Sequence, residues 1–213
     1  MEQTLIIGAS GQIGKQLTQL MLNEGNQVVA LVRDKSKLSD INQDNLSIVE
    51  ADLTEDFSRA FKQCTKVVFV AGSGGDTGAD KTILIDLWAA CRAADYAKSH
   101  GVNYFVMVSS IGADAPSQGP EKMQPYLVAK HMADEHLMGS GLQYSIIRPG
   151  TLTNDDATGK FTTERPEQKD QATITRADVA KALLFCVNNP PNKNVITELF
   201  NGNKSVDDAL TNQ

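Results

Sequence analysis

Tyr126 and Lys130 lie four residues apart in a segment with helical periodicity. Residues at this spacing share one face of a helix. A lysine ammonium beside a phenol stabilises the tyrosinate and so eases proton transfer. A serine hydroxyl, from Ser109 or Ser110, could then hold a carbonyl or alcohol oxygen while the tyrosine gives or takes its proton. The same Tyr/Lys spacing also occurs in ordinary helices, where it forms an exposed pair.

The N-terminal segment changes from strand to helix periodicity within a few residues. An apolar run, 4–7, leads into glycines 8, 11 and 14, and an amphipathic helix pattern follows. Glycines so placed let the backbone turn tightly, approach a pyrophosphate and pack the helix on the strand. The helix start suits a phosphate. The sequence therefore predicts a dinucleotide-binding turn formed by Gly8, Ser10, Gly11, Gln12, Ile13 and Gly14, although G-x-x-G-x-x-G is not the commonest fingerprint and such a turn could bind nothing.

Arg33 and Asp34 follow the second predicted strand, 27–32. In a dinucleotide fold, an acid at this strand end binds the ribose hydroxyls of NAD, whereas an arginine pairs with the 2′-phosphate of NADP. Arg33 therefore favours NADP, and Asp34 keeps NAD as an alternative. Alternatively, Arg33 is an ordinary solvated charge at the end of a strand and binds no cofactor.

Two further predicted strands, 46–51 and 66–71, end in residues that could flank the ligand. The carboxyl ends of parallel strands line the binding crevice of open α/β sheets. We expect Asp52 and Leu53 beside the adenine, and Ala71 and Gly72 beside the middle of the dinucleotide. Asp52 could instead cap its own loop.

The remaining pattern alternates helices and strands to the end of the chain. It predicts a core helix over 80–100 with Trp88 as a packing residue and one broad apolar face formed by Ile83, Leu84, Leu87, Cys91, Ala94 and Ala97. It also predicts a strand over 104–108, a pocket-covering loop over 112–125, and a helix from Tyr126 to Gly139. After an irregular stretch, 154–172, Thr175 and Ser205 are expected to cap the last two helices, with a strand over 195–201 between them. We expect an α/β fold with a doubly wound parallel sheet in a single domain, 1–213, of which 151–213 forms a small substrate-covering region.

Composition narrows the class of protein. The 213 residues are 41% hydrophobic and 22% charged, with a net charge of −6, which argues against a nucleic-acid surface. No apolar run is long enough to span a membrane, and the N-terminus lacks a signal-peptide pattern, so we expect a cytoplasmic protein. The spacing of the three cysteines (Cys64, Cys91 and Cys186) predicts buried thiols. Neither they nor His131 and His136 suggest a metal site.

In its order of motifs the chain resembles the short-chain dehydrogenase/reductase superfamily. The glycine turn, Val108-Ser109-Ser110, the Tyr126/Lys130 pair, 146–150 and 174–180 carry the resemblance over nearly the whole length. It is closest to the atypical NAD(P)-binding group, which includes bacterial proteins labelled sugar epimerases and flavin or biliverdin reductase-like enzymes. The resemblance implies that Ser110 is the catalytic serine, Tyr126 the acid/base, Lys130 the ligand of the nicotinamide ribose, and Pro149 and Gly150 neighbours of the nicotinamide.

We therefore expect an NADP-dependent reductase of a small carbonyl, quinone or flavin-like compound, monomeric or a small homo-oligomer. A nucleotide-sugar epimerase or dehydratase-like enzyme with retained NAD would use the same residues. The C-terminal part is small for binding a nucleotide sugar, which weakens the epimerase hypothesis. Many atypical members lack a working tyrosine, and the Tyr126/Lys130 pair retained here permits catalysis. A third alternative, a non-catalytic NADP(H)-binding redox sensor, needs the glycine turn and Arg33 but not Tyr126.

Overall fold

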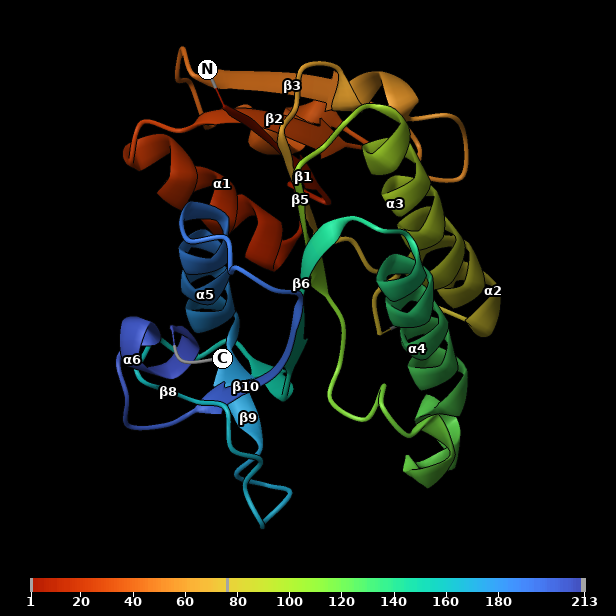
Figure 1. Cartoon of the computed structure of the whole chain (residues 1–213), viewed down its shortest axis with the longest axis vertical. Coiled ribbons are helices and arrows are strands. Elements are labelled where there is room, and N and C mark those ends of the chain that lie inside the picture. The colour runs from red at the N-terminus through yellow and green to blue at the C-terminus, as the bar shows by residue number, and fades with distance from the viewer. Residues whose placement is uncertain (1, 76, 212–213) are drawn as a thin grey trace.

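A computed structural model describes residues 2–75 and 77–211 of the chain. Its main sheet has the order β3-β2-β1-β4-β5-β6-β10-β8 (Figure 1). All neighbouring strands are parallel except β8, which pairs antiparallel with the end of β10. The strands are β1 (Gln3–Ile7), β2 (Gln27–Val32), β3 (Leu46–Glu50), β4 (Lys66–Phe69), β5 (Tyr104–Val108), β6 (Gln143–Pro149), β8 (Phe161–Thr162) and β10 (Val195–Asn201). This order confirms the predicted doubly wound α/β fold.

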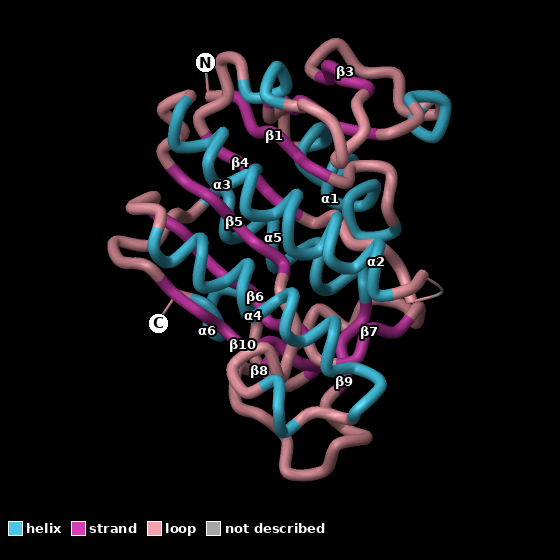
Figure 2. The backbone as a smooth tube through the Cα atoms, turned by 90° about the vertical axis from the view of Figure 1, so that its right-hand side faces the viewer, coloured by secondary structure: helices cyan, strands magenta, loops and turns pink. Residues whose placement is uncertain are grey.

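Helices cover both faces of the sheet. Helices α1 (Gln12–Asn23) and α5 (Arg176–Asn188) pack on one face, and α3 (Ala90–Ser99) and α4 (Gln124–Gly139) on the other (Figures 1 and 2). Because side chains alternate along a strand, Ile6 packs with the first pair, whereas Leu5 and Ile7 pack with the second. Both faces of the central strands are therefore buried, as their continuous apolar runs indicate.

Smaller elements complete the chain. Strands β7 (Thr151–Thr153) and β9 (Thr173–Thr175) form a separate parallel pair, and α6 (Val206–Leu210) follows β10. Single turns are α2 (Ala79–Lys81), η1 (Lys35–Leu38), η2 (Ser58–Phe61), η4 (Pro116–Gln118) and η5 (Glu121–Met123). Two of these turns lie in the expected loop 112–125, and α4 begins two residues earlier than predicted. The expectation of one domain stays a prediction.

The predicted helix caps are present. The side-chain oxygen of Thr175 accepts a hydrogen bond from the Asp178 amide at the start of α5, and Ser205 does the same with Asp208 at α6. Gly101, which follows α3, has φ +71° and ends that helix in the left-handed conformation.

The helix expected over 80–100 is irregular in its first half. Its segment η3 (Thr82–Ala89) is a π-helix, whose wider turn departs from the 3.6-residue period. The predicted apolar face is therefore wrong there, because Ile83 is 54% exposed and Asp86 is buried. The prediction that Trp88 packs in the core is also wrong, since 54% of this residue is exposed.

The three cysteines are free and buried, as predicted. Burial raises the pKa of the Cys64 and Cys91 thiols to about 11. Within the described residues, no helix combines the length and apolar character needed to cross a bilayer. The same part of the chain contains no group of three histidine, cysteine or acidic side chains arranged to hold a metal ion.

Candidate active site

The glycine turn between β1 and α1 is shaped by close backbone contacts. Gly8 has φ +92°, and a Cβ atom there would lie 2.7 Å from the Ala71 Cα atom. A Cβ on Gly14 would lie 2.2 Å from the Gly8 carbonyl oxygen, so this glycine lets α1 pack on β1. Gly11 is the N-cap of α1 and has more room. The first amides of α1 have no partner inside the helix and are available to an anion.

A cleft of about 500 Å³ lies at the carboxyl ends of β1, β2, β3 and β4. The cleft lies beside the position between β1 and β4 at which the strand order reverses. Ligands bind at this position in open α/β sheets. The structure brings together eight of the predicted cofactor residues in its lining: Gly8, Ser10, Gly11, Arg33, Asp52, Leu53, Ala71 and Gly72. Gln12, Ile13 and Gly14 are not in the lining. Gln12 is exposed, and the other two are buried behind the turn.

The charged residues at the end of β2, Arg33 and Asp34, are exposed and differ in their hydrogen bonds. Asp34 Oδ1 accepts hydrogen bonds from the amide (2.9 Å) and hydroxyl (2.7 Å) of Ser36, which hold the pKa of this carboxyl below its usual range. Arg33 makes no hydrogen bond or ion pair within the described residues. Lys37 and Lys81, which sequence reasoning missed, also line the cleft. The arginine is thus open to a ligand, while the neighbouring acid caps η1.

Asp52 accepts two hydrogen bonds from a residue two positions later in the chain, as Asp34 does. Its Oδ1 accepts hydrogen bonds of 2.8 Å from both the amide and the hydroxyl of Thr54, which lower the pKa of the Asp52 carboxyl. This is the loop cap that the sequence left as the alternative. Asp52 nevertheless lines the cleft, so one oxygen of its carboxylate can still face a ligand.

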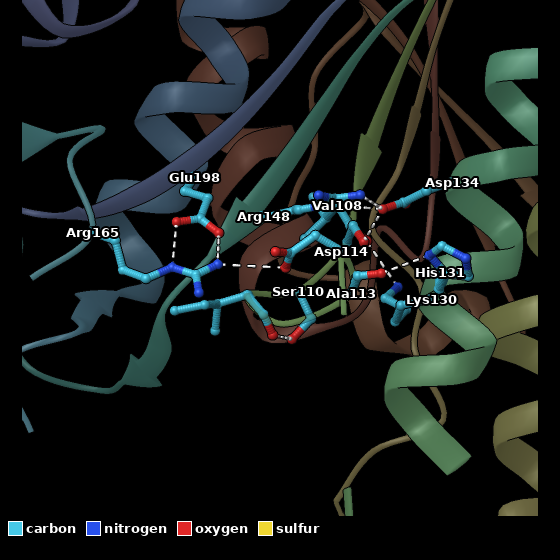
Figure 3. Close-up of polar contacts among 12 residues, drawn as sticks. Val108, Ser110, Ala113, Asp114, Lys130, His131, Asp134, Arg148, Arg165 and Glu198 are labelled. Carbon is cyan, nitrogen blue, oxygen red and sulfur yellow. Dashed lines mark hydrogen bonds and ion pairs between the residues drawn. The ribbon is translucent and has the colours of Figure 1, made fainter. Parts of the chain in front are cut away.

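Two serines follow β5 and have different environments. Ser109 is buried, and its hydroxyl donates a hydrogen bond of 2.8 Å to Asp134 Oδ2. Ser110 is half-buried, and its hydroxyl donates a hydrogen bond of 3.1 Å to the neighbouring Ile111 carbonyl, the one bond of this hydroxyl within the described residues. Ser110 is therefore the one of the two whose hydroxyl can turn to a substrate, and in Figure 3 it lies between two groups of charged residues.

Lys130 is buried on the inner face of α4, and Tyr126 is half-buried one turn before it. The Lys130 ammonium donates a hydrogen bond of 2.8 Å to the Val108 carbonyl and lies 3.7 Å from Asp86 Oδ1. Its nitrogen is 6.0 Å from the centre of the Tyr126 ring. The predicted pair thus shares one helix face, with the lysine fixed to the strand end that carries the serines (Figure 3).

A second buried ion pair, not predicted from the sequence, supports the same strand end. Asp134, fully buried on α4, accepts a hydrogen bond of 3.1 Å from Arg148 Nε on its Oδ2 atom, and Arg148 Nη2 forms an ion pair with the same oxygen at 3.0 Å (Figure 3). Burial raises the pKa of the Asp134 carboxyl, and the bonds from Ser109 and Arg148 partly offset this effect. The only sequence signal was the helical spacing of Lys130 and Asp134, which puts both on one face.

Arg165 connects two other segments on the side of Ser110 opposite the Asp134/Arg148 pair. Its guanidinium pairs with both oxygens of Glu198 and lies 3.4 Å from Asp114 in the loop after β5 (Figure 3). His131 Nδ1 donates a hydrogen bond of 2.8 Å to the Ala113 carbonyl in that loop. No periodicity or residue spacing in the sequence indicates these contacts.

Pro149 and Gly150, expected beside the nicotinamide, lie buried at the end of β6, outside the lining of the cleft. The Pro149 carbonyl accepts a hydrogen bond from the Ile111 amide. A Cβ on Gly150 would lie 2.4 Å from the Ala172 carbonyl oxygen, so this glycine permits close packing of two backbones. Their predicted contact with a cofactor stays a prediction.

Comparison with known proteins identifies the family. The family described as NAD(P)H-binding matches residues 8–190. The chain belongs to this NAD(P)H-binding family. The match agrees with the resemblance to the atypical short-chain dehydrogenase/reductase group that the motifs indicate.

Individual relatives cover almost all of this NAD(P)H-binding protein. A Bacillus subtilis protein named the uncharacterized sugar epimerase YhfK is 37% identical over 212 residues, 98% of each chain. A solved structure from Bacillus halodurans, provisionally described as an NAD-dependent epimerase/dehydratase, has a TM-score of 0.90 at 41% identity and covers 97% of each chain. The oxidoreductase ylbE from Lactococcus lactis has a TM-score of 0.85 at 26% identity, over 98% of this chain and 95% of that one.

The residues of the cleft fit a nicotinamide dinucleotide. A cavity of about 500 Å³ is in the usual range for such a ligand. The turn leaves no room for side chains at Gly8 and Gly14, which keeps the backbone amides accessible to a phosphate. Ser110, Tyr126 and Lys130 are not in the lining of this cleft. Ser110 follows the end of β5, and Lys130 of α4 donates its hydrogen bond to the Val108 carbonyl at that strand end.

Proposed function

We propose that this protein is an NADP-dependent reductase of a small carbonyl, quinone or flavin-like compound. The observation that carries the choice of NADP is the contrast between Arg33 and Asp34 at the end of β2. The carboxylate is engaged by Ser36, whereas the guanidinium has no partner within the described residues. An arginine that is free at this position can pair with a 2′-phosphate, a group that NADP carries and NAD lacks.

Ser110, Tyr126 and Lys130 together transfer a proton to the substrate. The bound nicotinamide supplies the hydride. In the reductive direction Tyr126 donates its phenolic proton to the substrate oxygen, and the Ser110 hydroxyl holds that oxygen by a hydrogen bond. Solvent then returns a proton to the tyrosinate. Lys130, fixed by the Val108 carbonyl, binds the nicotinamide ribose and stabilises the tyrosinate electrostatically.

A turnover assay tests this proposal. NADPH oxidation is followed with carbonyl, quinone and flavin substrates for wild-type protein, Tyr126→Phe and the matched control Tyr96→Phe, whose hydroxyl bonds Arg92 on α3. We expect Tyr126→Phe to lower kcat by about a hundredfold or more, with NADPH affinity unchanged, and Tyr96→Phe to leave kcat unchanged. Full activity in Tyr126→Phe would contradict the mechanism.

Epimerisation with retained NAD is the second candidate, favoured by the names of the Bacillus subtilis and Bacillus halodurans relatives. It would use Ser110, Tyr126 and Lys130 for a transient keto intermediate. The two reactions differ in the fate of the nucleotide. A reductase releases oxidised cofactor in every turnover, whereas an epimerase purifies with tightly bound nucleotide and consumes none. Acid extraction of nucleotide from purified protein, followed by chromatography, separates them.

A further inference from the structure

Lys130 and Asp86 form an ion pair that is almost completely shielded from water. Lys130 is 3% exposed and Asp86 is 1% exposed, with 3.7 Å between Nζ and Oδ1. The two residues come from different elements, α4 and the π-helix η3. A buried charge that loses its partner is costly, so each member of such a pair constrains the other.

The neighbouring charges do not replace Asp86. Asp134, one turn after Lys130, directs Oδ2 to Arg148 and Ser109. Within the part of the chain that the structure describes, Asp86 forms an ion pair with Lys130 alone. The four buried charges therefore divide into two pairs, Asp134 with Arg148 and Asp86 with Lys130.

The second oxygen of Asp86 reaches the wall of the cleft. Oδ2 accepts a hydrogen bond of 3.0 Å from the Ser73 amide, and Ser73 lines the cleft. The neighbouring Gly72 is so close that a Cβ there would lie 3.2 Å from Oδ1. One carboxylate thus joins the loop after β4 to the lysine of α4. π-Helical turns are rare and frequently occur at functional sites, and Asp86 lies within one.

We propose that Asp86 is a positioning residue, which compensates the Lys130 ammonium and orients it so that one N–H bond remains for a ribose hydroxyl of the dinucleotide. An ammonium has three N–H bonds. One is directed to the Val108 carbonyl and one faces Asp86, which leaves the third. This inference rests on the proposed function, in which Lys130 binds that ribose.

A double-mutant cycle tests the coupling. NADPH affinity and urea unfolding are measured for wild-type protein, Asp86→Asn, Lys130→Met and the double variant. Asparagine keeps the size of the side chain and an oxygen for the Ser73 amide but removes the charge. Asp95→Asn is the matched control, because Asp95 lies in the following helix and pairs with exposed His136.

We expect Asp86→Asn to weaken NADPH binding about tenfold in the wild-type background and not at all in the Lys130→Met background. The double variant, which leaves no unpaired charge, should be more stable than Asp86→Asn. Asp95→Asn should bind NADPH as wild-type protein does. Weakening of equal size in both backgrounds, or unchanged affinity in Asp86→Asn, would overturn the positioning role.

The same cycle separates this inference from the proposed function. Wild-type protein that binds neither NADPH nor NADH contradicts the proposed function and, with it, the role of Asp86. Wild-type protein that binds NADPH, without coupling between Asp86 and Lys130, contradicts the positioning role alone.

Discussion

At the end of β2 the charged side chains of the cleft are on the surface, whereas the charged side chains behind the end of β5 are buried. Arg33 and Asp34 are exposed, and the Asp34 carboxylate bonds only to Ser36, two residues away, within the described residues. Lys130, Asp134 and Arg148 are at most 9% exposed and connect α4 with two strands. Exposed charges are screened by water and salt, so they can contribute to ligand selectivity with little effect on the stability of the fold. Buried charges connect the elements that carry the catalytic groups, and replacing one of them leaves its partner buried and unpaired, which lowers stability.

The largest difference is expected when the same substitution is made in the two regions. Arg148→Met leaves Asp134 buried without its cation and should lower the free energy of unfolding by about 3–5 kcal/mol. Arg33→Met should change it by less than about 0.5 kcal/mol. Urea unfolding measures both values. Equal losses in the two variants would contradict the division between the regions.

The glycine turn allows a finer comparison within one motif. Alanine at position 14 would bring its Cβ to 2.2 Å from the Gly8 oxygen, and the resulting overpacking should cost about 1–3 kcal/mol of stability. Alanine at Gly11 would meet that oxygen at 3.3 Å, so we expect a smaller loss of stability together with weaker NADPH binding. Thermal unfolding of the two variants measures the loss of packing, and calorimetric titration measures the loss of NADPH affinity. Equal thermal stability of both would show that the close contact relaxes freely.

The adjacent serines should separate stability from activity. Ser109→Ala removes a buried hydrogen bond to Asp134 and should lower the free energy of unfolding by about 1.5 kcal/mol. Ser110→Ala should leave stability within about 0.5 kcal/mol of wild type. It should lower kcat at least about tenfold, because the hydrogen bond to the reacting oxygen is lost. The assignment of Ser110 fails if Ser110→Ala keeps full activity in the NADPH assay.

The smallest expected effect is that of salt. Because Arg33, Lys37 and Lys81 border an open cleft, added NaCl should weaken NADPH binding more than NADH binding. The coupling between buried Asp86 and Lys130 should change little over the same range. Titrations at two ionic strengths measure both. An equal response of the two nucleotides would place the 2′-phosphate away from these cations.

Local signals made most of the fold predictable. The glycine turn and the apolar runs identify β1, β2 and β4 because a strand that is buried on both faces needs an unbroken apolar sequence. Thr175 is recognisable as a cap because its partner amide is three residues away in the chain. The residues after each strand were correctly expected to share an edge, since parallel strands end together.

The contacts between distant segments were not predictable in the same way. Asp86 lies in a helix whose π-helical turn hides its burial from a 3.6-residue pattern. The choice between Ser109 and Ser110 depends on Asp134, which is 25 residues away. Arg165 lies in an irregular segment, where no periodicity fixes the position of a side chain, and it pairs with Glu198 of β10 and with Asp114 in the loop after β5.

The binding of the two nucleotides tests the central claim most directly. Purified protein is titrated calorimetrically with NADPH and with NADH, and the titrations are repeated with Arg33→Ala and the control Arg59→Ala, whose side chain bonds the Glu50 carbonyl outside the cleft lining. We predict that NADPH binds at least about tenfold more tightly than NADH and that only Arg33→Ala removes the difference. Absence of binding by either nucleotide, or a preference for NADH that Arg33→Ala does not change, would contradict it.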